Sequence, residues 1–123
     1  MRAAPAAVAL LLALAGTVQA ATRHGTARSD RLAGTAAGDT LYGFRGNDRL
    51  SGRAGDDYLS GGPGNDRLFG GTGSDDLDGG AGDDYIYARD GEQDTIDCGP
   101  GNDTVVVDAQ EDGVFDCENV VTP

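Results

Sequence analysis

Residues 61–87 read GGPGNDRLF, GGTGSDDLD and GGAGDDYIY, which is one pattern of nine residues written three times in succession. Each copy has glycine at positions one, two and four, aspartate at position six and a large aliphatic residue at position eight. The core positions of an ordinary globular domain follow the period of a helix or a strand. A fixed period of nine instead indicates one small structural unit that is copied and stacked.

The same register extends beyond these three copies. An aspartate recurs every nine residues, at Asp30, Asp39, Asp48, Asp57, Asp66, Asp75 and Asp84. An aliphatic side chain follows each aspartate by two positions, at Leu32, Leu41, Leu50, Leu59, Leu68, Leu77 and Ile86. We therefore expect the stacked array to occupy most of the chain.

The end copies depart from the pattern. The copies over residues 25–42 have Arg28 and Ala37 where the fourth glycine belongs. Beyond residue 87, Asp94 and Asp103 repeat the signature, but Asp94 follows Asp84 by ten residues, so one residue is inserted near residues 88–90. Atypical end copies are expected of a stacked array, because its end units must cap the core.

The nonapeptide GGxGxDxUx, with U a large aliphatic residue, resembles the repeat of the RTX (repeats-in-toxin) family, a calcium-binding β-helix repeat. The resemblance implies an all-β fold, a right-handed parallel β-roll (β-solenoid) with two repeats per coil. The last three residues of each repeat would form a short strand, with position eight inside and its neighbours outside. We expect the roll over residues 25–106, including the degenerate copies 25–42, and a C-terminal cap over residues 107–123.

The glycine-rich turns indicate a calcium cage. Glycine adopts positive φ without strain, so G-G-x-G permits a tight turn whose backbone carbonyls point inward. Carbonyl and carboxylate oxygens form a hard donor set, which favours Ca²⁺ over softer metals. Calcium is therefore the expected cofactor.

The resemblance makes residues eighteen apart neighbours on successive coils, with calcium between them. One edge would hold the pairs Asp30/Asp48, Asp48/Asp66 and Asp66/Asp84, and the other edge Asp39/Asp57 and Asp57/Asp75. The candidate metal ligands are Asp39, Asp48, Asp57, Asp66, Asp75, Asp84 and Asp103, together with Asp30 and Asp94 in copies where a complete site is not expected. The candidate backbone ligands in the turns are Gly46, Asn47, Gly55, Asp56, Gly62, Gly64, Asn65, Gly71, Gly73, Gly80, Gly82, Asp83, Gly101 and Asn102.

The alternative to a folded array is a disordered, glycine-rich acidic tail. Low hydrophobicity and a net charge of −12 favour it, but disorder does not require an aliphatic residue at every ninth position. One aliphatic side chain per repeat makes a thin core, and stacked acidic turns repel one another without a cation. We therefore expect metal binding and folding to be a single event.

The N-terminus predicts export. Met1-Arg2, an apolar run over residues 6–15 and Val18-Gln19-Ala20 as a small-x-small cleavage site are typical of a secretory signal peptide at residues 1–20. A retained membrane helix is the alternative, although the run is short for a bilayer. We expect a secreted protein, extracellular or at the cell surface, that uses the Sec route and has no membrane anchor.

Cys98 and Cys117 fit an oxidising compartment. Their separation of nineteen residues is about one coil, which would place them on neighbouring rungs, within reach of a disulfide. Two free thiols, an intermolecular disulfide and a metal site are the alternatives.

Catalytic motifs are not evident, and we expect no enzyme. His24 is the one histidine of the chain, and its position near the cleavage site predicts a loose terminus. No HExxH, GxSxG or phosphate-binding loop occurs, and the register of the carboxylates is typical of metal ligands.

Outward-facing positions suggest a partner surface. On every second repeat, positions seven and nine place Arg31, Arg49, Arg67, Phe69, Tyr85 and Tyr87 on one face. This face suits an anionic cell-surface polymer, while the alternative is a solubilising surface whose arginines offset nearby aspartates.

Three biological roles are compatible with these features. We favour a structural or adhesive calcium-binding module at the cell surface or matrix. The alternatives are an accessory module of a secreted hydrolase and a calcium store. No nucleic-acid partner is expected, and the oligomeric state stays open.

Overall fold

The chain was analysed in a computed structural model that describes residues 18–108 and 113–123. Within these residues it has twelve strands of three residues each and no helix. The strands are β1 (Thr22–His24), β2 (Arg31–Ala33), β3 (Thr40–Tyr42), β4 (Arg49–Ser51), β5 (Tyr58–Ser60), β6 (Arg67–Phe69), β7 (Asp76–Asp78), β8 (Tyr85–Tyr87), β9 (Thr95–Asp97), β10 (Thr104–Val106), β11 (Gly113–Phe115) and β12 (Asn119–Val121).

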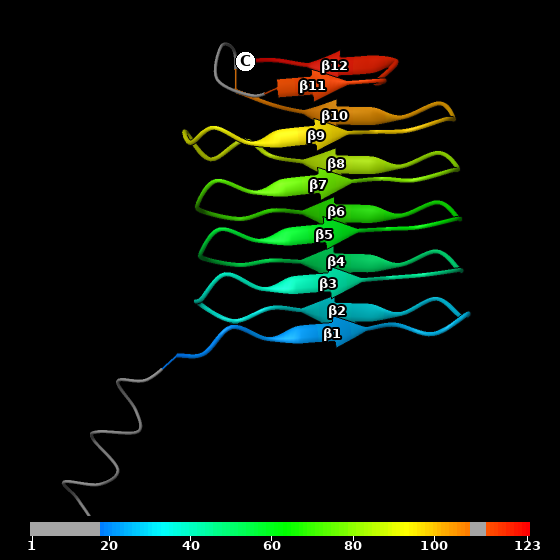
Figure 1. Cartoon of the computed structure of the whole chain (residues 1–123). Coiled ribbons are helices and arrows are strands. Elements are labelled where there is room, and N and C mark those ends of the chain that lie inside the picture. The colour runs from blue at the N-terminus through cyan, green and yellow to red at the C-terminus, as the bar shows by residue number, and fades with distance from the viewer. Residues whose placement is uncertain (1–17, 109–112) are drawn as a thin grey trace, which may run out of the picture.

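The strands form two parallel six-stranded sheets that face each other. One sheet has the order β1-β3-β5-β7-β9-β11 and the other β12-β10-β8-β6-β4-β2. Successive strands alternate between the sheets, so two repeats complete one coil, and the coils stack into a column (Figure 1). The predicted all-β parallel roll is confirmed, and its register pairs residues eighteen apart, such as Leu50 with Leu68.

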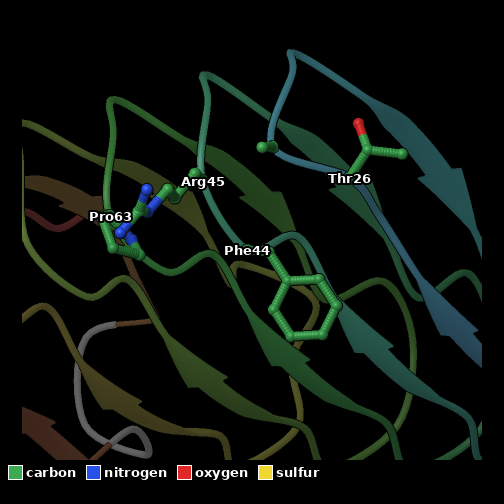
Figure 2. Close-up of a pocket in the computed structure, with 5 residues that line it drawn as sticks. Thr26, Phe44, Arg45 and Pro63 are labelled. Carbon is green, nitrogen blue, oxygen red and sulfur yellow. The ribbon is translucent and has the colours of Figure 1, made fainter.

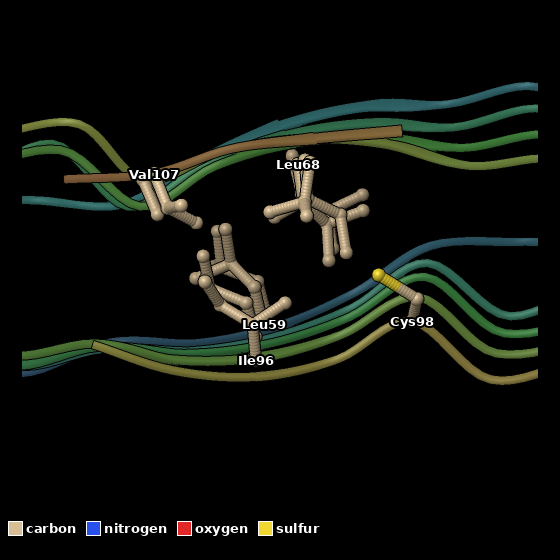
Figure 3. Close-up of a cluster of buried hydrophobic side chains, with 11 residues drawn as sticks. Leu59, Leu68, Ile96, Cys98 and Val107 are labelled. Atoms are coloured by element: carbon tan, nitrogen blue, oxygen red, sulfur yellow. The ribbon is translucent and has the colours of Figure 1, made fainter. Parts of the chain in front are cut away.

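The core is a double row of aliphatic side chains between the sheets. Position eight of each repeat points inward, so Leu59 and Ile96 from one sheet meet Leu68 from the other (Figure 3). From Leu41 to Val105 the residues at this position are fully buried. Burying each such side chain contributes about 1.5–3 kcal/mol relative to leaving it exposed. The core is therefore continuous along the column but only one side chain deep per strand.

The sheets extend beyond the predicted range of residues 25–106. At the N-terminus, the prediction of a loose terminus around His24 is wrong, because β1 pairs with β3 and places His24 opposite Tyr42. At the C-terminus, β11 pairs with β9 and β12 pairs with β10, so the predicted cap continues both sheets. The sequence signal is weak there because the tail loses the spacing of nine.

Parts of two predicted segments lie outside the described residues. These are residues 1–17 of the predicted signal peptide and residues 109–112 of the predicted cap. In the part of the chain that is described, no helix is long and apolar enough to cross a membrane.

The predicted cysteine pair forms a disulfide. Cys98 follows β9 and Cys117 follows β11, and their Cα atoms are 5.1 Å apart. The N–H of Cys98 also donates to the carbonyl of Phe115 at 3.0 Å. The bond therefore links two neighbouring coils at the C-terminal end of the roll, as the spacing of nineteen residues predicted.

Candidate metal centres in the turns

The turns line up along the two edges of the roll and stack the aspartates of position six into two ladders. In each ladder, the backbone N–H of one aspartate donates to Oδ1 of the aspartate one coil further on, at 2.7–2.8 Å. The structure thus brings together the predicted pairs on both edges. It also extends the ladders, because Asp75 pairs with Asp94 and Asp84 with Asp103.

The second carboxylate oxygen of the central aspartates is buried and has no hydrogen-bond partner. This holds for Oδ2 of Asp48, Asp57, Asp66, Asp75, Asp84 and Asp103. These carboxylates are at most 3 % exposed. Burying a charged group is costly unless it is paired or binds a metal. A cation bound along this row of oxygens would offset that cost.

In four of these turns, those of Asp48, Asp57, Asp66 and Asp84, the oxygen lies beside a backbone carbonyl of the next coil. A Cβ placed on Gly61 would be 2.5 Å from Oδ2 of Asp66 and 2.8 Å from the carbonyl oxygen of Gly79. A Cβ on Gly43 would similarly meet Oδ2 of Asp48 at 2.6 Å. Carboxylate and carbonyl oxygens therefore converge beside the first glycine, where no side chain fits.

The fourth glycine of each central repeat allows the coils to approach closely. Gly64 has φ of 124°, a value that residues with a side chain rarely adopt, and its carbonyl stacks against the turn of the next coil. A Cβ on Gly82 would collide with the carbonyl oxygen of Gly64. These glycines are therefore required both for the turn and for the stacking of one turn upon the next.

The side chains at position five form an outer ladder that sequence reasoning missed. Asn47, Asp56, Asn65, Asp83 and Asn102 were predicted only as backbone ligands. In the structure, Oδ1 of Asn47 accepts a hydrogen bond from the N–H of Asn65 at 2.8 Å, and Oδ1 of Asn65 accepts one from the N–H of Asp83 at 2.9 Å. The recurrence of Asn or Asp at position five was the available signal. This ladder staples successive turns without a metal.

The first two turns satisfy their aspartates differently. The N–H and Oγ1 of Thr26 donate to the carboxylate of Asp30, at 2.5 Å and 3.0 Å to Oδ2. In the next turn, the N–H and Oγ1 of Thr35 donate to Asp39, at 2.5 Å and 3.1 Å to Oδ2. The carboxylate of Asp30 or Asp39 thus already has donors within its own turn. These two turns differ from the central turns in that respect, and Asp30 and Asp39 stay predicted ligands.

The last coil also departs from the pattern. The backbone N–H of Asp103 donates to a carboxylate oxygen of Glu118 at 2.9 Å, so a glutamate from the tail takes the place of the next aspartate. The spacing of nine could not identify Glu118, because the tail has a different loop length.

The pKa values divide the aspartates in the same way. Burial raises them in the central turns, to about 6 for Asp57, about 7 for Asp66, about 7 for Asp75 and about 8 for Asp84. Burial also raises the pKa of Asp39, but hydrogen bonds from Thr35 and Ala21 outweigh it and hold that pKa below its ordinary value. The central carboxylates therefore resist ionisation unless a positive charge lies nearby.

A shallow hollow of about 560 Å³ lies beside the N-terminal turns and is lined by Thr26, Ala27, Phe44, Arg45 and Pro63 (Figure 2). Phe44 occupies a second-glycine position with φ of 68°. Its ring centroid lies 5.6 Å from that of His24. None of these five residues has a carboxylate, so the hollow is separate from the aspartate ladders in its chemistry.

The predicted partner face is assembled on one sheet. Arg31, Arg49, Arg67 and Tyr85 stand in register on β2, β4, β6 and β8. The Arg49 guanidinium carbon lies 4.4 Å from the ring centroid of Phe69, and Tyr85 and Tyr87 are exposed. The arginines and aromatic rings therefore form one continuous outer surface, distinct from the metal-binding edges.

The residues of the central turns fit calcium. Their donor set is all oxygen, it includes buried carboxylate atoms without partners, and the convergence point has no room for a side chain. In comparison with known protein families, the model described as RTX calcium-binding nonapeptide repeat (4 copies) matches residues 24–59, 60–92 and 69–105. Among curated proteins, the chain has no match.

Proposed function

This chain belongs to the RTX calcium-binding nonapeptide repeat family, and from that premise we propose that it is an exported protein whose roll forms when calcium binds. It is a calcium-binding repeat protein with a structural β-roll. The proposal adds that folding depends on the ion and that the folded roll works outside the cell as a structural or adhesive module.

The row of buried Oδ2 atoms without partners carries the proposal of coupled folding. Stacking brings these carboxylates together on each edge, and their charges repel one another in the absence of a cation. The core opposes this repulsion with one aliphatic side chain per strand. Chain entropy at the many glycines adds to the cost of folding, so the metal-free chain should be largely unfolded near neutral pH.

Different groups of residues would bind the ion and hold the coils of the folded roll together. Calcium, when bound, supplies positive charge between neighbouring turns. Oδ2 of the position-six aspartates and the first-glycine carbonyls would hold it, while Oδ1 keeps the backbone of the preceding coil in place. The position-five ladder spaces the turns, and the Cys98–Cys117 disulfide holds the last coils together.

Other features support the proposed export and adhesive role. The signal-peptide pattern and the disulfide suit an oxidising compartment outside the cytoplasm, where calcium sites of modest affinity are filled. The surface of Arg49, Phe69 and Tyr85 favours an anionic polymer as the partner, because the guanidinium groups offer charge and the rings offer flat apolar area.

Calcium titration of the purified chain, followed by circular dichroism, tests the coupled folding. We expect little β signal in excess chelator and a cooperative gain as calcium is added. A β-sheet spectrum that is the same in chelator and in calcium would contradict the proposal.

A pull-down from the cell envelope tests the adhesive role. The adhesive module should retain an envelope polymer only in calcium, and Arg49→Ser with Arg67→Ser should weaken that retention. A calcium store would bind the ion and retain no polymer, and an accessory module of a hydrolase would retain the enzyme instead.

A further inference from the structure

The residue inserted near residues 88–90 creates a loop unlike the turns below it. Residues 88–94 connect β8 to β9 on the edge that carries Asp57 and Asp75, and they form the yellow loop to the left of β9 in Figure 1. This loop has a single glycine, Gly91, whereas each central turn over residues 61–82 has three. It therefore lacks the G-G-x-G sequence that forms the nonapeptide turns.

At this step the carbonyl of the next coil is not among the atoms closest to the first glycine. A Cβ added to Gly61 would meet the carbonyl of Gly79 in the next coil, but the three atoms nearest to a Cβ on Gly70 all belong to Asp75. Asp90, in the inserted loop, instead brings a carboxylate oxygen close to that of Asp75. One oxygen each of Asp75, Asp90 and Asp94 lies within 4.8 Å of the other two.

In Asp75 and Asp90, one carboxylate oxygen is buried and has no hydrogen-bond partner. Asp75 is 3 % exposed, its Oδ1 accepts the N–H of Asp57 at 2.8 Å, and its Oδ2 has no hydrogen-bond partner. Oδ1 of Asp90 accepts the N–H of Glu92 at 2.8 Å, and its Oδ2 is shielded from solvent without a partner. Such oxygens are costly to bury unless a cation meets them.

Main-chain hydrogen bonds hold the group in position. The N–H groups of Asp90 and Gly91 donate to Oδ2 of Asp108 in the next coil, at 3.0 Å and 2.6 Å. Oδ1 of Asp94 accepts the N–H of Asp75 at 2.7 Å. The three carboxylates are therefore oriented by neighbouring coils before any ion is considered.

We propose that Asp75, Asp90 and Asp94 form a calcium site of a second kind, in which three side-chain carboxylates surround one ion. Calcium–oxygen distances of about 2.3–2.6 Å let one ion contact oxygens up to about 5 Å apart. The nonapeptide turns offer aspartates in pairs, so this site carries more negative charge and fills first as calcium is added. It rests on the proposed calcium-dependent folding and adds a site that the nine-residue repeat does not contain.

The test compares Asp90→Asn with the matched control Asp83→Asn. Each substitution removes one negative charge from a turn and keeps Oδ1, which accepts the N–H of Glu92 in one case and of Asn102 in the other. Asparagine is natural at position five, where other repeats have Asn47 and Asn65. Only the first substitution removes an oxygen from the proposed site.

Calorimetric titration of the purified chain with calcium, with circular dichroism on the same samples, gives the readout. Asp90→Asn should raise the Kd of the tightest step at least about tenfold, whereas Asp83→Asn should change it by less than about twofold. Identical isotherms for the two variants would overturn the three-carboxylate site.

The remaining outcomes are also decisive. If Asp90→Asn does not fold at any calcium concentration, Asp90→Glu is measured as well. An Asp90→Glu variant that folds and keeps the parent's Kd for the tightest calcium-binding step supports a ligand role. Failure of Asp90→Glu to fold shows that residue 90 matters for the shape of the loop alone. A parent chain that neither binds calcium nor folds with it defeats the proposed function itself. A parent that does both, with no difference between the variants, defeats only this site.

Discussion

The first turns of the roll and the turns at its centre place the same residue in the same position for different purposes. Asp39 and Asp66 are both buried, at 3 % and 1 % exposure. Thr35, at position two of its turn, donates its N–H and hydroxyl to Asp39. Position two of the central turn is Gly62, and Oδ2 of Asp66 has no hydrogen-bond partner.

Burial alone therefore does not make a metal site in this fold. Two carboxylates with almost no exposed surface have pKa values shifted in opposite directions, because Asp39 has donors inside its own turn and lies nearer the end of the roll, where burial raises its pKa less. A threonine at position two lets the end coil satisfy its own aspartate, whereas a glycine there leaves the carboxylate for a cation. The N-terminal end should thus depend less on calcium than the centre.

The largest effect should come from removing a central ligand. Asp66→Asn keeps the Oδ1 that accepts the N–H of Asp48 but removes an oxygen from the centre of the ladder. We expect the calcium concentration at half-folding to rise at least about tenfold. Asp30→Asn, the same change in a threonine-capped turn, should shift it by less than about twofold. Equal shifts in the two calcium titrations would mean that the aspartates act only as diffuse charge.

The next effect is a dependence on pH that the central aspartates should dominate. Their folded-state pKa values, about 6 for Asp57 to about 8 for Asp84, lie above the ordinary value of 3.8. A raised folded-state pKa stabilises the metal-free roll below pH 3.8, and this stabilisation is lost as pH rises through about 6–8.

Protons and calcium should accordingly compete for these groups. Lowering the pH from about 8 to about 6 should weaken calcium binding, by up to about tenfold per pH unit for each proton displaced. In chelator, the β signal should be larger near pH 4 than at pH 8. Calcium titrations with the same Kd at both pH values would show that the central carboxylates are ionised before the ion binds.

The smallest effect should come from the threonine caps. Thr35→Val removes the hydroxyl that donates to Asp39 and preserves the shape of the side chain. By analogy with helix caps, we expect a loss of about 1 kcal/mol in saturating calcium, with unchanged calcium stoichiometry. Thr72→Val is the control, because exposed Thr72 donates through its backbone N–H, to Arg53. An equal loss of stability on thermal unfolding of both variants would contradict the distinction between capped and metal-binding turns.

Much of the roll could be predicted because each repeat specifies itself locally. Glycines make the turn, and the residue at position eight must face inward in a three-residue strand, so every strand from β2 to β10 follows from the period. The same period placed Cys98 and Cys117 on neighbouring coils. The period did not predict β1, β11 and β12, which pair with neighbouring strands although their sequences lack the nine-residue pattern.

Several parts of the candidate site could not be predicted, because they depend on contacts between coils. Nothing in the register shows that Glu118 replaces an aspartate beyond Asp103, or that Asn65 links its turn to the two adjacent coils. Asp90 lies outside the nine-residue pattern, and its oxygen comes within 4.8 Å of that of Asp75 because the inserted loop stacks on the turn of the preceding coil.

By itself, the sequence determined the nine-residue unit, its inward-facing aliphatic residue and the calcium-type donor set, because these follow from the order of residues within one repeat. The register of eighteen residues per coil came from the resemblance of that repeat to the RTX family. The tertiary structure decided which aspartates keep an oxygen for a cation. Each carboxylate either accepts hydrogen bonds inside its own turn or keeps an oxygen without a partner, according to the turn around it and the coil stacked upon it. Thr35 donates to Oδ2 of Asp39 within one turn, whereas Oδ2 of Asp66 is buried without a partner once the neighbouring coils are stacked.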